Sequence, residues 1–410
     1  MKKTVFIIET YNQYLTRILD DLRKGKLTGL KISTMNLFAE QKTLVHNFLS
    51  EVVAANQKSP NNFLVYHDQV YTHRMLVMPD GHYIFQHSPW DLSKKKLKKP
   101  ARQTRNQNLR EFSDVLVNLP PRFYQISTEA GFWKKLASNH LLQHLATSHV
   151  KASLARYRSG RLETAVQTGE LSSASNQNNL SLTIVDNEPA AKFIEAVINP
   201  KAKIGNCGFV TKQIAPNIKL VVDYGNYGKP GEISYIHELA ETMMNPKYLS
   251  RIIGNKTLKH TPTNVIMISQ YVPSGRILKA LKLAAEQYKA RVVVPLEPDD
   301  DYRRHEIGFK LMDKNFQIRR GKHILTPTRP VPSHTKCLVV AYDDGRLSMI
   351  FGSDNFDSTS DRFYRNTELS LHVDRVKRGD DGYDMIVAML KKLVEDREID
   401  QSEYDSIIKK

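Results

Sequence analysis

The chain contains two copies of one short pattern, and each copy opens with Ser-His-x-Lys. The first copy begins at residues 148–151 and the second at residues 333–336. A Gly-Arg-Leu segment follows the histidine at the same distance in both copies, at Gly160 and at Gly345, and a Leu-Ser-Leu segment comes later in each. One His-x-Lys would carry little information. Two copies in matched frames predict a duplicated fold that brings a pair of histidines and a pair of lysines together.

The second copy carries further features that point to its chemistry. An apolar strand, a turn at residues 343–345 and a return strand lead to Gly-Ser-Asp-Asn at residues 352–355, and Glu368 stands at the head of a later strand. This order resembles the phospholipase D superfamily, whose signature is His-x-Lys with a Gly-Ser-x-Asn turn and a later glutamate. Residues 270–274 and the helix that follows them are similar to the bacterial cardiolipin synthase branch, a group of phosphatidyltransferases.

The resemblance implies a catalytic set in which two histidines share the work. The set is His149, Lys151, His334, Lys336, Asn355 and Glu368. One imidazole can attack phosphorus covalently while the other protonates the departing alkoxide. The lysines and Asn355 would stabilise charge on the equatorial oxygens of a five-coordinate phosphorus. Glu368 matches the family glutamate that fixes the tautomer of a catalytic histidine. The resemblance favours His149 as the nucleophile, whereas the fuller motif around His334 favours the reverse.

The first copy departs from the family pattern at its turn. We align Gly-Glu-Leu-Ser at residues 169–172 with residues 352–355, which requires two extra residues in the return strand. This alignment predicts Ser353, Glu170 and Ser172 as substrate-binding residues, with Ser172 donating a hydrogen bond where the asparagine would. Glu170 should repel a phosphate unless it pairs with a lysine.

Two acidic positions of the family pattern are also changed. Asn179 stands opposite Glu368. In the second copy Ala341 holds the place where the family has an acid after the histidine, and the nearest acid is Asp343. Because of these departures, one alternative remains: a diverged protein that binds a phosphodiester but does not turn it over.

Strands and helices follow one another in the same order in both halves of the chain. The expected order of strand, helix and strand falls at residues 30–35, 44–53 and 63–66 and again at 265–268, 277–288 and 291–294. The sequence therefore predicts an α/β protein of two similar phospholipase D-like halves, each a mixed β-sheet flanked by helices, related by a pseudo-two-fold axis with the active site between them. The halves are placed at residues 1–187 and 188–410, with insertions at about 67–119 and 198–260.

The cysteine content limits the chemistry that the chain can use. Its 410 residues contain only two cysteines, Cys207 and Cys337, which excludes a disulfide scaffold and leaves no cysteine cluster for a metal. The resembled chemistry needs neither metal nor cofactor, so the sequence predicts none. The acidic turn at residues 299–301 is interpreted as an ordinary turn.

The charge balance indicates a polyanionic partner. The chain has 60 Lys and Arg against 43 Asp and Glu, a net charge of +17. Such a balance suits an anionic phospholipid surface or a nucleic acid. The densest basic run, residues 94–99, is either a solvated loop or a docking patch. The apolar run at the start of the chain is too short for a signal peptide, and no apolar segment is long enough to cross a bilayer. We therefore expect a cytoplasmic protein that can attach to a membrane at its surface.

These features predict a metal-independent phosphodiester enzyme that works through a phosphohistidine. The resembled branch implies phosphatidyl transfer or phospholipase D activity on phospholipid. The alternatives are a nuclease or nucleic-acid phosphodiesterase on the same fold and the non-catalytic binding protein described above.

Overall fold

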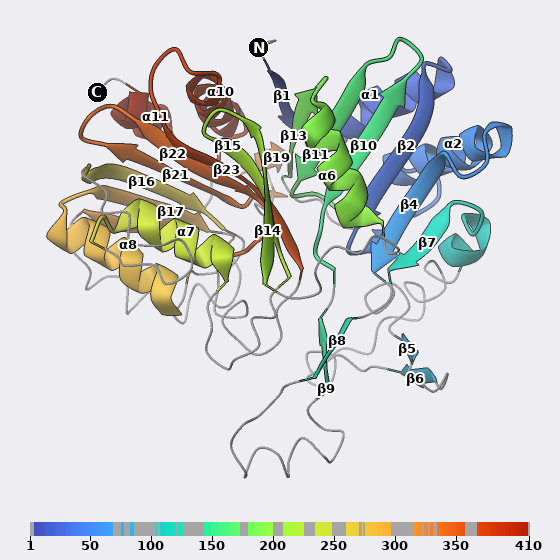
Figure 1. The fold of residues 1–410 in the computed structure, drawn as a ribbon, viewed down its shortest axis with the longest axis horizontal. Coiled ribbons are helices and arrows are strands. Elements are labelled where there is room, and N and C mark those ends of the chain that lie inside the picture. The colour runs from blue at the N-terminus through green and yellow to red at the C-terminus, as the bar shows by residue number, and fades with distance from the viewer. Residues whose placement is uncertain are drawn as a thin grey trace.

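Two mixed β-sheets form the frame of the molecule (Figure 1). The computed structural model describes residues 4–68, 104, 107–119, 148–172, 179–199, 208–224, 234–247, 260–269, 273, 275–296, 315–320, 334–356 and 367–408, together with short strands between residues 75 and 146 and between 324 and 330. Both termini of this part lie at the same end of the molecule, opposite the small hairpins β5–β6 and β8–β9.

The first sheet has seven strands, of which one side is antiparallel and the other parallel. In spatial order they are β1 (Val5–Thr10), β13 (Leu180–Val185), β11 (Leu162–Gln167), β10 (Ala152–Tyr157), β2 (Leu27–Thr34), β4 (Phe63–Asp68) and β7 (Leu116–Leu119). The strands from β1 to β2 pair antiparallel, and β2, β4 and β7 pair parallel. The parallel pair β2–β4 needs a crossover connection, which contains α2, whereas α1 connects β1 with β2, two strands that are not neighbours in the sheet.

The second sheet repeats this order and adds one strand at its edge. In spatial order it contains β14 (Phe209–Ala215), β15 (Ile218–Asp223), β23 (Glu368–Val376), β22 (Leu347–Gly352), β21 (Cys337–Tyr342), β16 (Pro262–Ile268), β17 (Arg291–Leu296) and β18 (Phe316–Arg320). Short two-stranded pairs complete the list: β3 (Leu37–Phe38) with β12 (Leu171–Ser172), β5 (Met75–Val77) with β6 (Tyr83–Phe85), β8 (Arg122–Gln125) with β9 (Gln143–Ala146), and β19 (Ile324–Thr326) with β20 (Arg329–Pro330).

The repeat extends into the range 198–260, where the sequence predicts an insertion. β15 pairs with β23 as β1 pairs with β13. The helix α7 (Tyr235–Met244) follows β15 as α1 (Tyr11–Arg23) follows β1. These elements therefore belong to the repeated unit and not to an insertion; their strand and helix positions match while their sequences do not. Most of the range 67–119 lies outside the described residues, and the boundary between residues 187 and 188 stays a prediction.

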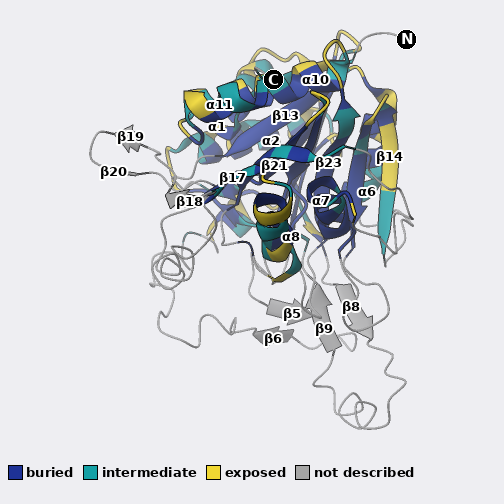
Figure 2. Cartoon of the chain, turned by 90° about the vertical axis from the view of Figure 1, so that its left-hand side faces the viewer, coloured by how far each residue is buried: buried dark blue, intermediate teal, exposed yellow. Residues whose placement is uncertain are grey.

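The helices divide the hydrophobic core into three layers. α1 and α2 (Leu44–Lys58) cover the outer face of the first sheet, and α7 and α8 (Gly275–Gln287) cover the outer face of the second. α6 (Glu188–Ile198) and α10 (Asp381–Glu395) pack in the core that the inner faces of both sheets share, with α11 (Gln401–Ile408) at its end. Figure 2 shows buried strands behind α8, exposed residues on α8 itself, and α7 almost entirely buried.

Local signals explain where the helices begin. Thr10 forms a capping box with Gln13 at the start of α1, and the side chains of Thr43, Asn187 and Ser234 cap α2, α6 and α7. The predicted helices at 44–53 and 277–288 are confirmed as α2 and α8, each with one apolar face buried. Among the described residues, no helix has the length and apolar character that crossing a membrane requires.

Candidate active site between the two halves

The two His-x-Lys segments lie immediately before the equivalent strands β10 and β21. His149, Lys151, His334 and Lys336 are all buried, and both lysines are fully so. A parallel bridge joins Ser148 to Thr367 just ahead of β23, and the backbone N–H of His149 donates to the carbonyl of Thr367 at 2.9 Å. The first motif is therefore attached directly to the second half of the molecule.

A carboxylate from the second half holds the first histidine. His149 Nδ1 lies 2.8 Å from Glu368 Oε1 and 2.9 Å from Oε2. The hydroxyl of Ser353 donates to Glu368 Oε2, and the backbone N–H of Leu369 donates to that hydroxyl at 3.0 Å. Glu368 is the first residue of β23, so the pairing of β22 with β23 fixes the carboxylate against the imidazole.

An amide from the first half holds the second histidine in the same way. His334 Nδ1 lies 2.8 Å from Asn179 Oδ1 and 2.9 Å from the carbonyl oxygen of Thr168. A carbonyl oxygen accepts only, so Nδ1 of His334 carries a proton and Nε2 is left for chemistry. The sequence shows Asn179 opposite Glu368 but gives it no role. Its position just before β13, equivalent to the head of β23, is the signal that could have assigned it to His334.

The two lysines have different partners. Lys336 Nζ donates to the carbonyl oxygen of His334 at 2.7 Å. Lys151 Nζ lies 3.6 Å from Glu170 Oε1, the pairing that the sequence made the condition for tolerating this acid near a phosphate. Burial lowers the pKa of Lys151, and the charge of Glu170 opposes this. The carboxylate of Glu170 is therefore a charged neighbour of Lys151 within the site.

The structure corrects the alignment of the two turns. Thr168 and Ser353 make the same bonds: their N–H groups donate to Leu180 and Leu369, each at 3.0 Å, and their hydroxyls accept from the N–H groups of the same two leucines. No extra residues are present in the return strand, so Glu170 occupies the position of Asn355. Ser172 lies instead in β12, paired beside Phe38 of β3.

Burial shifts the pKa values of the central groups toward their neutral forms. It lowers the pKa of both histidines well below the usual range, and the two lysines lower it further. Burial also raises the pKa of Glu368 to about 8, with a further contribution from the charge of Asp354. The electrostatic influence of both lysines on both histidines shows that the two motifs lie in one site.

A second buried pair stands behind Glu368 and is absent from the sequence-based site. Asp354 Oδ1 lies 3.1 Å from His237 Nε2 on α7 and accepts from the N–H of Phe356 at 2.7 Å. Burial alone would raise the pKa of Asp354, but His237 and the hydrogen bonds hold it below its usual range. His237 comes from a region without sequence similarity between the halves, so the repeat gave no signal for it.

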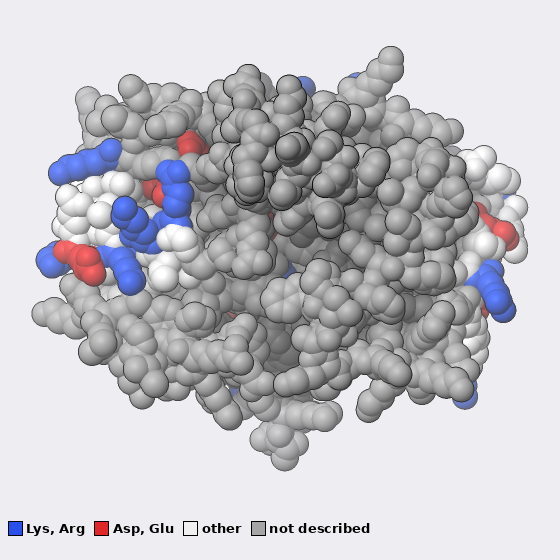
Figure 3. Space-filling view, turned by 90° about the horizontal axis from the view of Figure 1, so that it is seen from below, with Lys and Arg blue, Asp and Glu red and all other residues white. Residues whose placement is uncertain are grey.

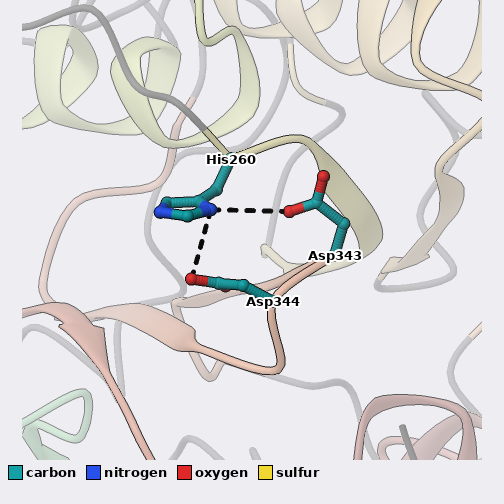
Figure 4. Close-up of side chains that lie close together, drawn as sticks. All are labelled: His260, Asp343 and Asp344. Atoms are coloured by element: carbon teal, nitrogen blue, oxygen red, sulfur yellow. Dashed lines mark ion pairs between the residues drawn. The ribbon is translucent and has the colours of Figure 1, made fainter.

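The acid that follows the second motif lies elsewhere. Asp343 and Asp344 form the turn at the far end of β21 from His334, and His260 Nδ1 lies 3.7 Å and 3.2 Å from their carboxylates (Figure 4). These three side chains are close enough to share an ion. Arg346 already pairs with Asp344 at 3.2 Å, and the group is at the surface. Asp343 therefore takes no part in the arrangement around the histidines.

One outer helix carries a group of basic side chains at the surface. In the view of Figure 3, described basic side chains gather over α8, which carries Arg276, Lys279 and Lys282. The basic run at residues 94–99 and the acidic turn at 299–301 lie outside the described residues. A docking role for the basic run stays a prediction.

Comparison with known proteins relates the chain to solved structures only. No family model matches it, and no curated protein does. A phosphatidylserine synthase from Haemophilus influenzae aligns with a TM-score of 0.53 and 11% identity over 97% of this chain and 86% of its own. A polyphosphate kinase from Porphyromonas gingivalis aligns with a TM-score of 0.51 and 9% identity over 95% of this chain, which spans half of that kinase, 50%. The alignment over almost all of the chain shows that it shares the two-sheet fold of these two structures.

Proposed function

We propose that the chain is an enzyme that cleaves or transfers a phosphodiester through a covalent phosphohistidine. The observation that carries the proposal is the crossed pairing of the histidines, in which each Nδ1 is bonded to a side chain of the opposite half. This arrangement fixes both imidazoles and leaves both Nε2 atoms for the substrate. One substrate phosphorus between them would then meet a nucleophile on one side and an acid on the other.

His149 is the nucleophile in this proposal. Attack by its Nε2 on phosphorus forms a P–N bond and breaks the bond to the leaving oxygen, and the imidazole then carries positive charge while Nδ1 keeps its proton. The carboxylate of Glu368, 2.8 Å from Nδ1, would stabilise that charge. Asn179 offers His334 only a neutral oxygen, which makes His334 the weaker candidate for a cationic intermediate.

His334 is the general acid and then the general base. Its Nε2 would give a proton to the leaving alkoxide as the P–O bond breaks. In the second step it would take a proton from water or an alcohol, whose oxygen attacks phosphorus and releases His149. A neutral partner on Nδ1 and burial both favour the loss of this proton. Lys151, Lys336 and Asn355 would stabilise the equatorial oxygens, as the sequence predicts.

The substrate proposed first is a phospholipid, with phosphatidyl transfer or phospholipase D activity at a membrane surface. The fold shared with a phosphatidylserine synthase and the net charge of +17 support this choice. The same charge also suits nucleic acid, so a nuclease is the second candidate. The similarity of residues 270–274 to cardiolipin synthases supports transfer to an alcohol acceptor.

One assay separates these candidates. The wild type, His149→Ala, His334→Ala and the control His260→Ala are offered phosphatidylglycerol vesicles and single-stranded DNA with EDTA present. We expect lipid turnover in the wild type and the control and a loss of about 10²–10⁴-fold in each site variant. DNA cleavage lost in the same two variants would favour the nuclease. Turnover that survives His149→Ala would overturn the proposal.

Trapping the intermediate assigns the two histidines. A diester with a 4-nitrophenolate leaving group needs little help from an acid, so His334→Ala should accumulate phosphoenzyme on His149. His149→Ala should form none. A phosphoryl group found on His334 would reverse the roles.

A further inference from the structure

We propose that Glu170 selects the substrate by binding a hydroxyl or ammonium group next to the scissile phosphodiester. The substrate class is then a phospholipid with such a donor in its headgroup. This inference rests on the function proposed above and adds a specificity residue to it. It starts from the corrected alignment, which places Glu170 at the position of Asn355.

The exchange of an amide for a carboxylate changes what this position can bind. An asparagine can both donate and accept, and the buried Oδ1 of Asn355 has no hydrogen-bond partner among the described residues. It is therefore free to meet a ligand. An ionised carboxylate only accepts. On the Glu170 side of the site, a phosphate oxygen would find no donor from this position, whereas a hydroxyl or ammonium group would find a charged acceptor.

The fold holds Glu170 in place. The N–H of Leu171 donates to Thr34 Oγ1 at 3.2 Å, and the N–H of Ser172 donates to the carbonyl of Glu170 at 2.8 Å. Gly169 lies against the ring of Tyr11 so closely that a Cβ there would come within 2.3 Å of Cδ1. The turn therefore has one conformation packed against α1, and the Glu170 side chain, 12% exposed, is part of a built site.

Lys151 makes this acid relevant to the substrate. Its Nζ is fully buried, donates no hydrogen bond to a described residue and faces Glu170 at 3.6 Å. A phosphate oxygen that binds Lys151 therefore arrives beside the carboxylate. The repulsion is smaller for a singly charged diester than for a doubly charged monoester, and a donor on the substrate that bonds to Glu170 offsets it. A phosphodiester whose headgroup has a hydroxyl or an amine close to phosphorus is singly charged and also offers this donor.

The test compares two lipids of equal charge. Phosphatidylglycerol carries headgroup hydroxyls and phosphatidylmethanol carries none, so general attraction to the vesicle is the same for both. We expect the wild type to prefer phosphatidylglycerol in kcat/KM, and Glu170→Asn to reduce this preference by about 10-fold or more, as a hydrogen bond to a charged group would. Glu170→Gln keeps the length of the side chain and should act in the same direction. Glu395→Gln, on the exposed side of α10, is the control.

Two further arms separate failure of this inference from failure of the proposed function. Bis(4-nitrophenyl) phosphate has no headgroup donor, so its turnover by the wild type reports the chemistry alone. If the wild type hydrolyses this diester but the lipid preference is equal in the wild type and Glu170→Asn, the inference is wrong and the function stands. If nothing is turned over, co-flotation with the same vesicles replaces turnover, and an equal binding preference in both proteins overturns the inference.

An oligonucleotide arm identifies the source of the donor. The ribose 2′-hydroxyl offers the same chemistry beside a phosphodiester. A preference for RNA over DNA that Glu170→Asn removes, without a change in the lipid preference, would show that Glu170 reads a nucleic acid and would overturn the assignment to phospholipid.

Discussion

Glu368 and Asn179 occupy equivalent places in the two halves, yet only one of them can carry a charge. Each faces Nδ1 of a buried histidine at 2.8 Å. The difference gives two chemically similar imidazoles different preferences for the protonated state, which is what a nucleophile and an acid require. Asp354 acts on Glu368 through its charge, and His237 holds Asp354 at 3.1 Å.

Replacing Asp354 should therefore move the pH profile. Burial and the charge of Asp354 raise the pKa of Glu368, the partner of His149, to about 8. Asp354→Asn removes the second contribution, so the acidic limb of kcat/KM should shift to lower pH. The measurement is the pH–rate profile on a chromogenic diester, with Asp374→Asn at the surface end of β23 as the control. A limb at the same pH in both variants would exclude Asp354 as a positioning residue for this pair.

His372 is a buried titratable group outside the site. Neither ring nitrogen has a hydrogen-bond partner among the described residues, and burial, with Lys219, lowers its pKa from 6.5 to about 3. Between these two pKa values, the imidazole of His372 binds a proton in the unfolded chain but not in the folded chain. The free energy of unfolding should therefore fall as the pH decreases from 6.5 toward 3. His372→Leu removes this dependence and should raise the free energy of unfolding at pH 7 by about 1–3 kcal/mol. Urea unfolding at pH 7 and pH 5 tests this, and equal pH dependence of both proteins would contradict it.

At the scale of elements, tight pairing of β22 with β23 positions Ser353 and Glu368. Gly352 ends β22, and a Cβ there would lie 2.2 Å from the carbonyl oxygen of Leu369. That neighbour is backbone, so it can move only if β23 moves.

Gly352→Ala should consequently disturb both stability and activity. We expect a loss of about 1–3 kcal/mol in the free energy of unfolding, since overpacking forces a backbone shift, and a fall in kcat as Glu368 moves from His149. Gly29→Ala in β2, where the nearest atom would lie 3.3 Å away, is the milder comparison. Thermal unfolding with the chromogenic assay measures both effects. Equal effects of the two substitutions would show that the Gly352 contact relaxes without moving β23.

The sequence predicts the elements well and the contacts between them poorly. Periodic apolar residues locate α2 and α8, because burial of one face imposes the pattern directly. Apolar runs locate β2 and β16, which are buried on both faces. The bond from Asn179 to His334 joins residues far apart in the chain, and no local pattern encodes it. The alignment of Gly169 with Gly352 is wrong because the backbone bonds of Thr168, which define the register of this turn, form only in the folded sheet. His237 lies in α7, which matches α1 in position but not in sequence, so the repeat does not predict it.

At the scale of the whole molecule, one hydrophobic core joins the inner faces of both sheets with α6 and α10. α10 also reaches β1 of the other sheet, and α6 reaches β14. The halves are therefore coupled by packing as well as by the crossed histidine bonds.

Separated halves should accordingly be inactive. Residues 1–187 or 188–410 expressed alone would expose the shared core and lack the partner of their histidine, so we expect aggregation or partial folding and no turnover. Coexpression should restore a complex with measurable activity. Size-exclusion chromatography and the chromogenic assay test this, and a stable monomeric half would show that the shared core is not required for folding.

The crossed bonds also give the site a direction. In a perfectly symmetric pair of halves, a phosphodiester could lie across the axis either way round, and each of its two ester arms would be released equally often. Glu368 on one side and Asn179 on the other make the two orientations unequal, and Glu170 opposite Asn355 does the same for the groups that flank phosphorus. A chain built from two copies of one unit thus distinguishes the left arm of its substrate from the right.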